Sequence, residues 1–204
     1  MRLYALLTEE YCLHGWKWTA RQLVEGGVDV LQLREKHLPE SVVLARARKL
    51  RGLADETGCL LIVNDRPDIA LLSDADGVHL GQDDLPPEEV RKLVGKDMII
   101  GLSTHNAKQA REAAERGADY AAVGPVFPTR TKGYNEGGGT EFVRTMCGVT
   151  DLPTVAIGGI TAERASEVAR TGITAQAACQ ALSDTDAPRR AAERFKEQIL
   201  EHQQ

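Results

Sequence analysis

The sequence lacks the features of membrane proteins and of proteins that bind nucleic acids. No run of about 18 apolar residues occurs, so we expect no membrane-spanning helix. The first apolar run, residues 3–7, is too short for a signal peptide. The formal net charge is −5 and no block of lysine and arginine is present, which argues against binding along a nucleic acid. A local basic pocket for a small anion is still compatible with this composition.

Cysteines and aromatic residues are also few. The four cysteines stand far apart, without a CxxC pair or the spacing of a zinc site, so we expect reduced thiols and a cytoplasmic protein. Aromatic residues make up 4% of the chain and hydrophobic residues 42%, which predicts a core of Leu, Val, Ile and Ala. The order and spacing of the residues give no Ser-His-Asp or Cys-His arrangement.

Short apolar runs alternate with amphipathic stretches along the chain. The runs predict strands at 3–7, 29–35, 59–63, 77–80, 98–102, 120–124, 154–157 and 173–178. Helices are expected at 19–26, 39–57, 67–72, from 86 onward, and at 106–117, 141–148, 161–171 and 187–202. The strands are apolar on both faces and no GxGxxG follows the first one. Eight such units, at about 25 residues each, predict one α/β domain over 1–204, a single (β/α)₈ TIM barrel.

The second predicted strand carries polar side chains on one face. Residues alternate between the two faces of a strand, so Gln32, Arg34 and Lys36 lie together. Two cations so placed repel each other unless an anion lies between them, and a phosphate group suits both. The alternative is an edge strand that faces solvent.

Polar residues also follow the other predicted strands. In TIM barrels the catalytic residues lie at the carboxyl ends of the strands, so we expect these residues to meet at one mouth. They are Asn64, Asp65, Asp83, Asp84, Ser103, Thr129, Thr131, Lys132, Gly158 and Gly159.

Two of these strand ends predict particular ligands. Asp65 and Asp84 are oxygen donors that suit Mg²⁺ shared with a phosphorylated substrate, although either could instead cap a helix. Gly158 and Gly159 precede a predicted helix and could admit a phosphate to its first turn, although a tight turn is the simpler interpretation. The glycine-rich segment 128–139 is either a mobile lid or a surface loop.

Five segments of the chain resemble thiamine phosphate synthases. The family couples hydroxymethylpyrimidine diphosphate to hydroxyethylthiazole phosphate, which gives thiamine phosphate and pyrophosphate. The resemblance therefore implies a TIM-barrel transferase with two phosphorylated small molecules as partners and Mg²⁺ as cofactor. A homo-oligomer is compatible with it. The segments are QLREK at 32–36, VNDR at 63–66, GVHLGQDD at 77–84, VGPVFPTRTK at 123–132 and VAIGGI at 155–160.

The resemblance also implies a role for each site residue. The pyrimidine diphosphate would be held by Gln32, Arg34, Lys36, Asn64, Ser103 and Lys132. Mg²⁺ would be held by Asp65 and Asp84, and the thiazole phosphate by Thr129, Thr131 and Gly159. When pyrophosphate leaves first, the negative charge that develops on it must be stabilised. Arg34, Lys36 and Lys132 would do this and would therefore be the catalytic residues.

The chain departs from the family pattern in two places. After the eighth strand the family has an apolar residue followed by Ser, which help to bind the thiazole phosphate. Here Cys179 and Gln180 stand at these positions, and Gln180 replaces the hydroxyl with a larger amide. His37 stands where Asp is common.

Two other functions are compatible with the same pattern. TenI-type thiazole tautomerases have a catalytic His after the sixth-strand Gly, where this chain has Pro125. The carboxylate pair, which an isomerase would not need, also favours the synthase. The second alternative is a non-catalytic relative that keeps the phosphate-binding pocket, which the changed residue at Gln180 suggests.

Overall fold

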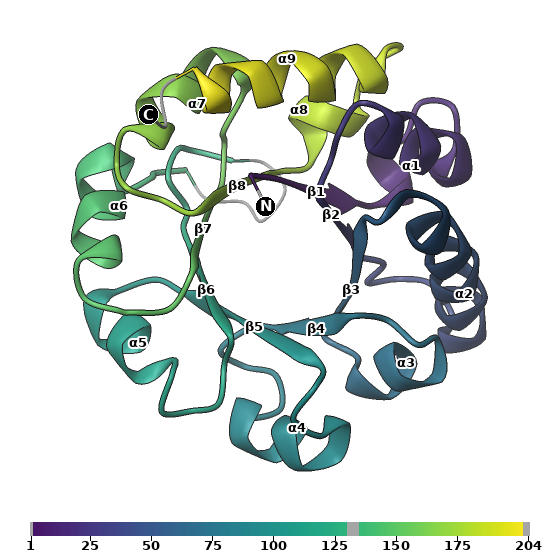
Figure 1. Cartoon of the computed structure of the whole chain (residues 1–204), viewed down its shortest axis with the longest axis horizontal. Helices are drawn as coiled ribbons and strands as arrows, with labels where there is room; N and C mark the ends of the chain where they lie inside the picture. The colour runs from purple at the N-terminus through teal and green to yellow at the C-terminus, as the bar shows by residue number, and fades with distance from the viewer. Residues whose placement is uncertain (1, 130–134, 202–204) are drawn as a thin grey trace.

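Eight parallel strands form a closed barrel in the computed structural model, which describes residues 2–129 and 135–201 (Figure 1). The strands pair in sequence order, and the last pairs with the first, so the sheet has no free edge. This confirms the predicted (β/α)₈ TIM barrel. The strands are β1 (Leu3–Leu7), β2 (Val30–Leu33), β3 (Leu60–Asn64), β4 (Gly77–Leu80), β5 (Ile99–Thr104), β6 (Tyr120–Val123), β7 (Thr154–Ile157) and β8 (Ala175–Ala178).

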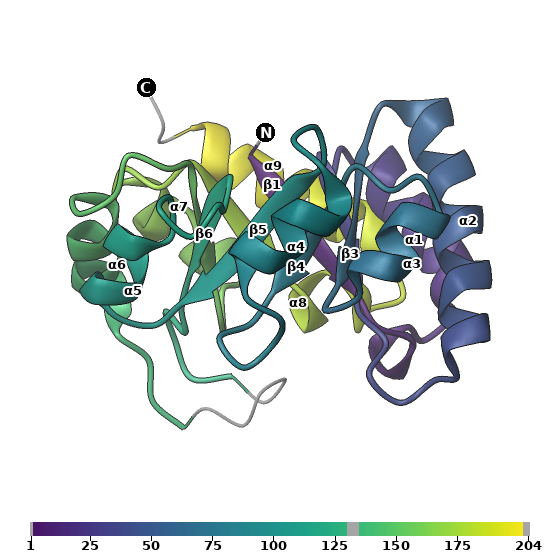
Figure 2. The same ribbon diagram turned by 90° about the horizontal axis from the view of Figure 1, so that it is seen from below.

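Helices surround the outside of the barrel (Figures 1 and 2). Among the described residues, no helix combines the length and the apolar character needed to cross a membrane. The helices are η1 (Glu9–Tyr11), α1 (Trp16–Glu25), α2 (Glu40–Thr57), α3 (Pro67–Leu72), α4 (Pro87–Val94), α5 (Ala107–Glu112), α6 (Gly139–Cys147), α7 (Ala162–Ala169), α8 (Gln180–Ser183) and α9 (Pro188–Leu200).

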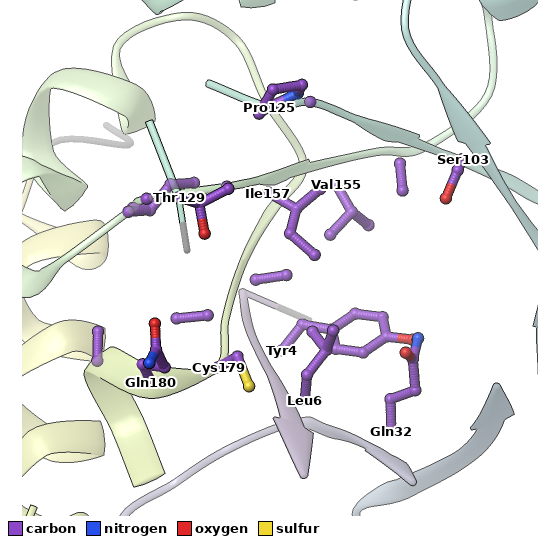
Figure 3. Close-up of a pocket in the computed structure, with 18 of the residues that line it drawn as sticks. Tyr4, Leu6, Gln32, Ser103, Pro125, Thr129, Val155, Ile157, Cys179 and Gln180 are labelled. Atoms are coloured by element: carbon purple, nitrogen blue, oxygen red, sulfur yellow. The ribbon is translucent and has the colours of Figure 1, made fainter. Parts of the chain in front are cut away.

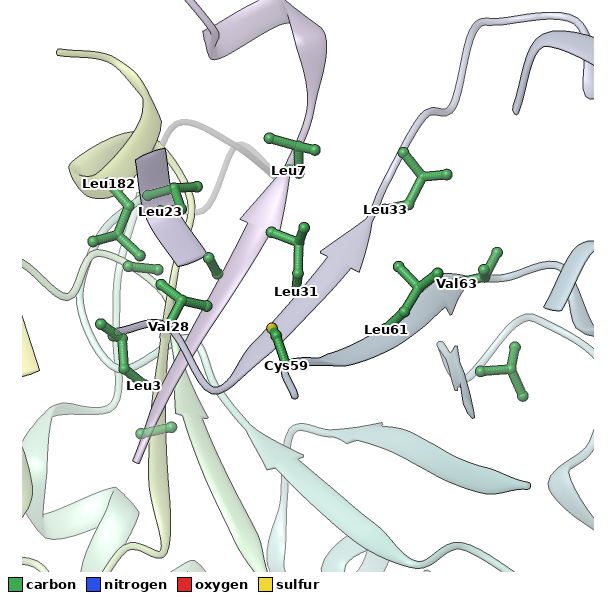
Figure 4. Close-up of a cluster of buried hydrophobic side chains, with 14 of the residues drawn as sticks. Leu3, Leu7, Leu23, Val28, Leu31, Leu33, Cys59, Leu61, Val63 and Leu182 are labelled. Atoms are coloured by element: carbon green, nitrogen blue, oxygen red, sulfur yellow. The ribbon is translucent and has the colours of Figure 1, made fainter. Parts of the chain in front are cut away.

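The alternation of side chains along the strands produces two separate cores. Leu31 and Leu33 of β2 point outward into the layer between sheet and helices, which Figure 4 shows around β1 to β3. Val30 and Gln32 are buried on the opposite face, and Val30 belongs to the cluster inside the barrel. Gln32 therefore lies on the inner face of the barrel, opposite to the face that carries Leu31 and Leu33.

Several element boundaries follow the predictions closely. Strands β1, β4 and β7 and helix α3 have the predicted ends. Asn106 caps α5, where its side chain accepts a hydrogen bond from the Gln109 N–H. Thr161 stands at the predicted N-cap of α7, but its side chain makes no capping hydrogen bond there.

Other boundaries were predicted wrongly. Helix α1 begins at Trp16 rather than at residue 19, and α5 ends at Glu112 rather than at residue 117. The sequence analysis missed the short helices η1 and α8, because one turn is too short to show a helical period.

The outer face of β2 is fixed to the helix layer by charge. Glu35 follows β2 and lies on the face opposite Arg34, with a side chain only 6% exposed. It pairs with Arg46 of α2 at 2.8 Å, and Arg46 also pairs with Glu9 and stacks over the Trp16 ring. These contacts hold β2 in register from outside.

Candidate active site at the carboxyl ends of the strands

A cavity of about 540 Å³ lies inside the mouth of the barrel. All eight strands contribute residues to its lining, and the loops after β6, β7 and β8 form one side of it. Figure 3 shows the side chains of Tyr4, Gln32, Ser103, Thr129 and Gln180 around this space. A cavity of this size is large enough for a small organic ligand or for two that must react.

The inner end of the cavity is a chain of buried hydrogen bonds. Gln32 Nε2 donates to the Tyr4 hydroxyl at 2.7 Å, and the Tyr4 and Tyr120 hydroxyls lie 2.9 Å apart. His79 continues the chain, with Nδ1 2.9 Å from the Tyr120 hydroxyl and Nε2 3.0 Å from Ser103 Oγ. The rings of His79 and Tyr120 are stacked at 5.6 Å. The chain thus joins β2, β1, β6, β4 and β5 beneath the ligand space.

The hydrogen-bonding groups of this chain can be satisfied in sequence. Gln32 Nε2 donates to the Tyr4 hydroxyl, and at each of the next three contacts either partner can be the donor. When Tyr4 donates to Tyr120 and Tyr120 donates to His79 Nδ1, His79 carries its ring proton on Nε2 and donates to Ser103, which leaves the Ser103 hydroxyl proton to donate elsewhere. Burial raises the pKa of Tyr4 and Tyr120 well above the ordinary tyrosine value, so both remain neutral donors.

One buried atom in this region has no hydrogen-bond partner among the described residues. Gln32 is 3% exposed, and no described residue donates to its Oε1, although its Nε2 donates to Tyr4. A buried carbonyl oxygen without a donor costs about 1–3 kcal/mol, so a ligand that donates an N–H here would be favoured. An amino-substituted ring is a ligand of that kind.

The side of the cavity at β2, β3 and β4 carries charged groups. Arg34 and Asn64 line the cavity. Lys36 Nζ lies 3.0 Å from Asp65 Oδ2, and Asp84 Oδ2 accepts from the Gly81 N–H at 2.6 Å. We name the group Arg34, Lys36, Asp65 and Asp84 the charged wall. Lys36, Asp65 and Asp84 lie outside the lining of the cavity itself, beside Arg34 and Asn64.

Asp65 is an unusual carboxylate in two ways. Its backbone is in the left-handed region, with φ 63°. Burial and the neighbouring Asp84 raise its pKa above the ordinary value for aspartate, although Lys36 opposes this shift. Because Asp84 disfavours the charged form of Asp65, a cation in addition to Lys36 would stabilise the pair.

The carboxylate pair fits Mg²⁺ with partners from a substrate. In the described part of the chain, no group of three or more His, Cys, Asp or Glu residues could hold a metal ion. Mg²⁺ commonly binds one or two carboxylates and completes its shell with water and phosphate oxygens. Asp65 and Asp84 therefore fit a metal shared with a diphosphate and do not fit a site made by protein alone.

The opposite side of the cavity is built from backbone. Gly158 and Gly159 follow β7 with φ 104° and 62°, which favour glycine. A Cβ on Gly159 would lie 2.5 Å from Pro128 O, so the turn packs directly against the loop after β6. Phe127 N donates to Gly158 O at 2.9 Å and fixes the two segments together.

Residues after β8 complete that side. Cys179 and Gln180 line the cavity beside Gly159. Burial raises the pKa of the Cys179 thiol to about 12, so this cysteine is neutral and a poor nucleophile near neutral pH. We name Gly158, Gly159, Cys179 and Gln180, together with Arg164 described below, the acceptor wall.

Most of the predicted site residues meet at this mouth. The cavity is lined by Gln32, Arg34, Asn64, Ser103, Thr129, Gly159, Cys179 and Gln180, and the charged wall adds Lys36, Asp65 and Asp84. Asp83 is exposed and does not line the cavity. The predictions for Thr131 and Lys132, and for a lid over 128–139, fall wholly or partly on 130–134, which lie outside the described residues.

Several polar residues of the cavity lining were not among the predicted site residues, and Tyr4, Tyr120, His79 and Arg164 are among them. Tyr4 and Tyr120 occupy inward positions in strands that otherwise carry small or apolar residues there, and this could have singled them out. His79 lies within the predicted strand 77–80 and has partners on both ring nitrogens, as a satisfied interior histidine does. Arg164 gave no signal, because an exposed arginine is ordinary on the polar face of a helix.

Comparison with known proteins places the chain among thiamine-related enzymes. Residues 3–182 match the family described as thiamine monophosphate synthase. A thiamine-phosphate synthase from Shouchella clausii is 46% identical over 182 residues, which are 87% of this chain and 85% of that protein. One from Halalkalibacterium halodurans is 43% identical over 175 residues, with 85% and 83% covered. The solved structure of thiamine phosphate pyrophosphorylase from Pyrococcus furiosus superposes with a TM-score of 0.91 at 34% identity, covering 98% and 96% of the two chains.

Proposed function

The chain belongs to the thiamine monophosphate synthase family, and from that premise we propose that it is a transferase that makes thiamine phosphate. The proposed donor is hydroxymethylpyrimidine diphosphate, and the acceptor is hydroxyethylthiazole phosphate. The observation that carries the proposal is a cavity with the acceptor wall on one side, with Arg34 of the charged wall in its lining on the other, and with a floor of neutral hydrogen-bonding groups between them. A donor with a diphosphate and an acceptor with one phosphate match these walls.

The proposed reaction forms one bond and breaks one. The bond between the pyrimidine methylene carbon and the diphosphate oxygen breaks, and the diphosphate leaves with the electron pair. The thiazole nitrogen then supplies its lone pair to the methylene carbon. No proton has to move in either step, which agrees with the neutral Cys179 thiol in the cavity lining.

The residues of the cavity would divide this work between them. Arg34 and Lys36 would stabilise the charge that develops on the leaving diphosphate. The resemblance assigns the same role to Lys132. Gln32 Oε1 would accept from the pyrimidine amino group, and Ser103 would donate to a ring nitrogen. Asn64 would contact the same substrate, and Thr129, Thr131, Gly159, Cys179 and Gln180 would surround the acceptor phosphate.

Asp65 and Asp84 would hold the proposed Mg²⁺. When bound, this ion would neutralise charge on the diphosphate and so make it a better leaving group. Lys36 would share Asp65 with the metal and keep the second carboxylate oxygen in place. We further propose that residues 1–204 form one domain, and we infer a cytoplasmic location from the four free cysteines.

The tautomerase alternative is less well supported. Pro125, which lines the cavity, stands where the resemblance would place the tautomerase histidine. The raised pKa of Asp65 beside Asp84 also describes a pair that suits a metal, for which an isomerase has no use. A non-catalytic binding protein would keep the pocket but would not need the metal pair.

Product analysis tests the proposal directly. The purified protein is incubated with both substrates and Mg²⁺, and the products are identified by mass spectrometry. We expect thiamine phosphate and pyrophosphate in equal amounts, with loss of product when Mg²⁺ is chelated. Isomerisation of a thiazole carboxylate phosphate without any coupling would establish the tautomerase instead. Binding of both substrates without either reaction would establish the non-catalytic protein.

A further inference from the structure

The acceptor wall contains a cation that the sequence analysis did not select. Arg164 lies in the first turn of α7, five residues after Gly159, and it lines the cavity. Among the described Lys and Arg residues, Arg34 and Arg164 are the two that line this cavity. Arg34 follows β2 and Arg164 follows β7, so the two guanidinium groups come from different sides of the barrel.

The guanidinium of Arg164 is held in place by two contacts. Its Nη1 donates to Gly159 O at 3.2 Å, and its Cζ lies 4.5 Å from the centroid of the Phe127 ring. The carbonyl and the ring restrict an otherwise flexible side chain, which lowers the entropy cost of binding an anion. The neighbouring acid, Glu163, pairs with Arg194 at 3.1 Å, so it does not compete for Arg164.

A carboxylate on this side of the cavity makes a cation useful for binding a phosphate there. Asp184 also lines the cavity, and its carboxylate would repel a phosphate dianion placed beside Gly159. Gln180, which stands where the resemblance leads us to expect a serine hydroxyl, brings an amide and no charge. A cation on the acceptor wall offsets Asp184 and supplies the donors that a phosphate needs.

We propose that Arg164 binds the phosphate of the acceptor substrate and determines the preference of this protein for a phosphorylated acceptor. The inference rests on the proposed function and assigns a role to a residue of this chain that the resemblance does not include. In this arrangement Arg164 takes over the contact that Gln180 does not provide. A charge-assisted hydrogen bond of this kind changes affinity by about 10- to 100-fold.

The test compares two acceptors in two variants. Arg164→Ala should raise the KM for hydroxyethylthiazole phosphate about 10- to 100-fold, with kcat changed less. The KM for hydroxyethylthiazole, which lacks the phosphate, should stay within about twofold of the unsubstituted protein. Arg164→Lys keeps a charge but not the planar fork, and it should recover part of the affinity.

A matched control uses the other end of the same helix. Arg170 is exposed at the C-cap of α7 and does not line the cavity. Arg170→Ala removes the same charge and should leave both KM values unchanged. Circular dichroism and the melting temperature establish that each variant is folded before its kinetics are compared.

The outcomes separate this inference from the proposed function. Equal KM increases for the two acceptors, or none for either, would overturn the role of Arg164 while coupling by the unsubstituted protein stands. A protein that couples neither acceptor would refute the proposed function. Calorimetric titration with hydroxyethylthiazole phosphate alone still tests Arg164 in that case, and the inference fails if Arg164→Ala binds it as tightly as the unsubstituted protein does.

Discussion

The charged wall and the acceptor wall, each of which we propose to bind phosphate, are built by different means. The charged wall gathers Arg34, Lys36 and two carboxylates at the ends of neighbouring strands. The acceptor wall uses a glycine turn, one arginine from a helix and uncharged residues after β8. A leaving group gains charge during the reaction and needs cations, whereas an acceptor keeps its phosphate charge throughout and needs only to be held.

Because of this difference, substitutions in the charged wall should mainly change kcat, and substitutions in the acceptor wall should mainly change the KM for the acceptor. Changes in the charged wall should lower kcat, because the interactions strengthen in the transition state. Changes in the acceptor wall should raise the KM for the acceptor, because the contacts to its phosphate are equally strong in the bound substrate and in the transition state. The predictions below test that separation.

The largest effect is expected at Asp84. Asp84→Ala removes one of two carboxylates for the proposed metal, so we expect kcat to fall by at least about 100-fold, with the acceptor KM little changed. Steady-state kinetics over a range of Mg²⁺ concentrations check this. The control is Asp83→Ala, an exposed neighbour, which should behave like the unsubstituted protein. Unchanged turnover in Asp84→Ala would remove this residue from the site.

A smaller effect is expected from Gly159→Ala. The new Cβ meets Pro128 O and Phe127, and the backbone has φ 62°, so the turn must shift. We expect the acceptor KM to rise about tenfold and the free energy of unfolding to fall by about 1–3 kcal/mol. Kinetics and urea denaturation measure the two effects.

Gly172→Ala is the matched control for that variant. Gly172 has φ 87° but open space around its Cβ position, so the variant carries the backbone strain without the clash. It should lose stability and keep the acceptor KM. A raised KM in both variants would show that the turn after β7 has no special part in acceptor binding.

Tyr120→Phe should affect the floor between the walls. The variant interrupts the hydrogen-bond chain and removes the partner of His79 Nδ1, so the contact of His79 Nε2 with the Ser103 hydroxyl loses its support. We expect kcat to fall about five- to tenfold. In a Ser103→Ala background the same change should cost little more, because both act through one hydroxyl. Additive effects would separate Tyr120 from Ser103.

The smallest expected effect is a shift in pH dependence. Burial and Asp84 raise the pKa of Asp65, and Lys36 lowers it. At limiting Mg²⁺, the loss of activity on the acid side of the pH profile should therefore begin above the pH expected for an ordinary aspartate. In Lys36→Gln this loss should begin at a still higher pH, because Lys36 no longer lowers the pKa of Asp65. The contribution of Asp65 to the free energy of unfolding should fall as the pH rises, because a carboxyl with a raised pKa favours the folded state most when it is protonated. A salt-bridged surface aspartate has the opposite pH dependence. A loss of activity that begins at the same pH in Lys36→Gln would exclude Asp65 as its origin.

Much of the barrel could be predicted from local sequence. The alternation at 30–33 and the apolar runs at 3–7, 77–80 and 154–157 each specify a buried strand by themselves. Parallel topology then brings strand ends together, so residues as distant as Arg34 and Gly159 could be assigned to one mouth. The resemblance to a known family added the substrates.

What could not be predicted depends on side chains that meet only after folding. Tyr4 and Tyr120 are 116 positions apart and carry no local sign of their hydrogen bond. The role inferred for Arg164 depends on Phe127 and on the turn that brings it to the cavity. Helix α8 is one turn long, so no helical period in the sequence indicates it.

The left-handed backbone of Asp65 has a consequence for how such a protein would change over generations. Its conformation is one that Asn or Gly adopts more easily, and its carboxylate is repelled by Asp84. Replacement by Asn would relieve both penalties and should raise the melting temperature while it removes one proposed ligand of the metal. Selection for stability alone would thus erase this aspartate, and its presence agrees with the catalytic role proposed for it. A duplicate copy released from that selection should lose it early.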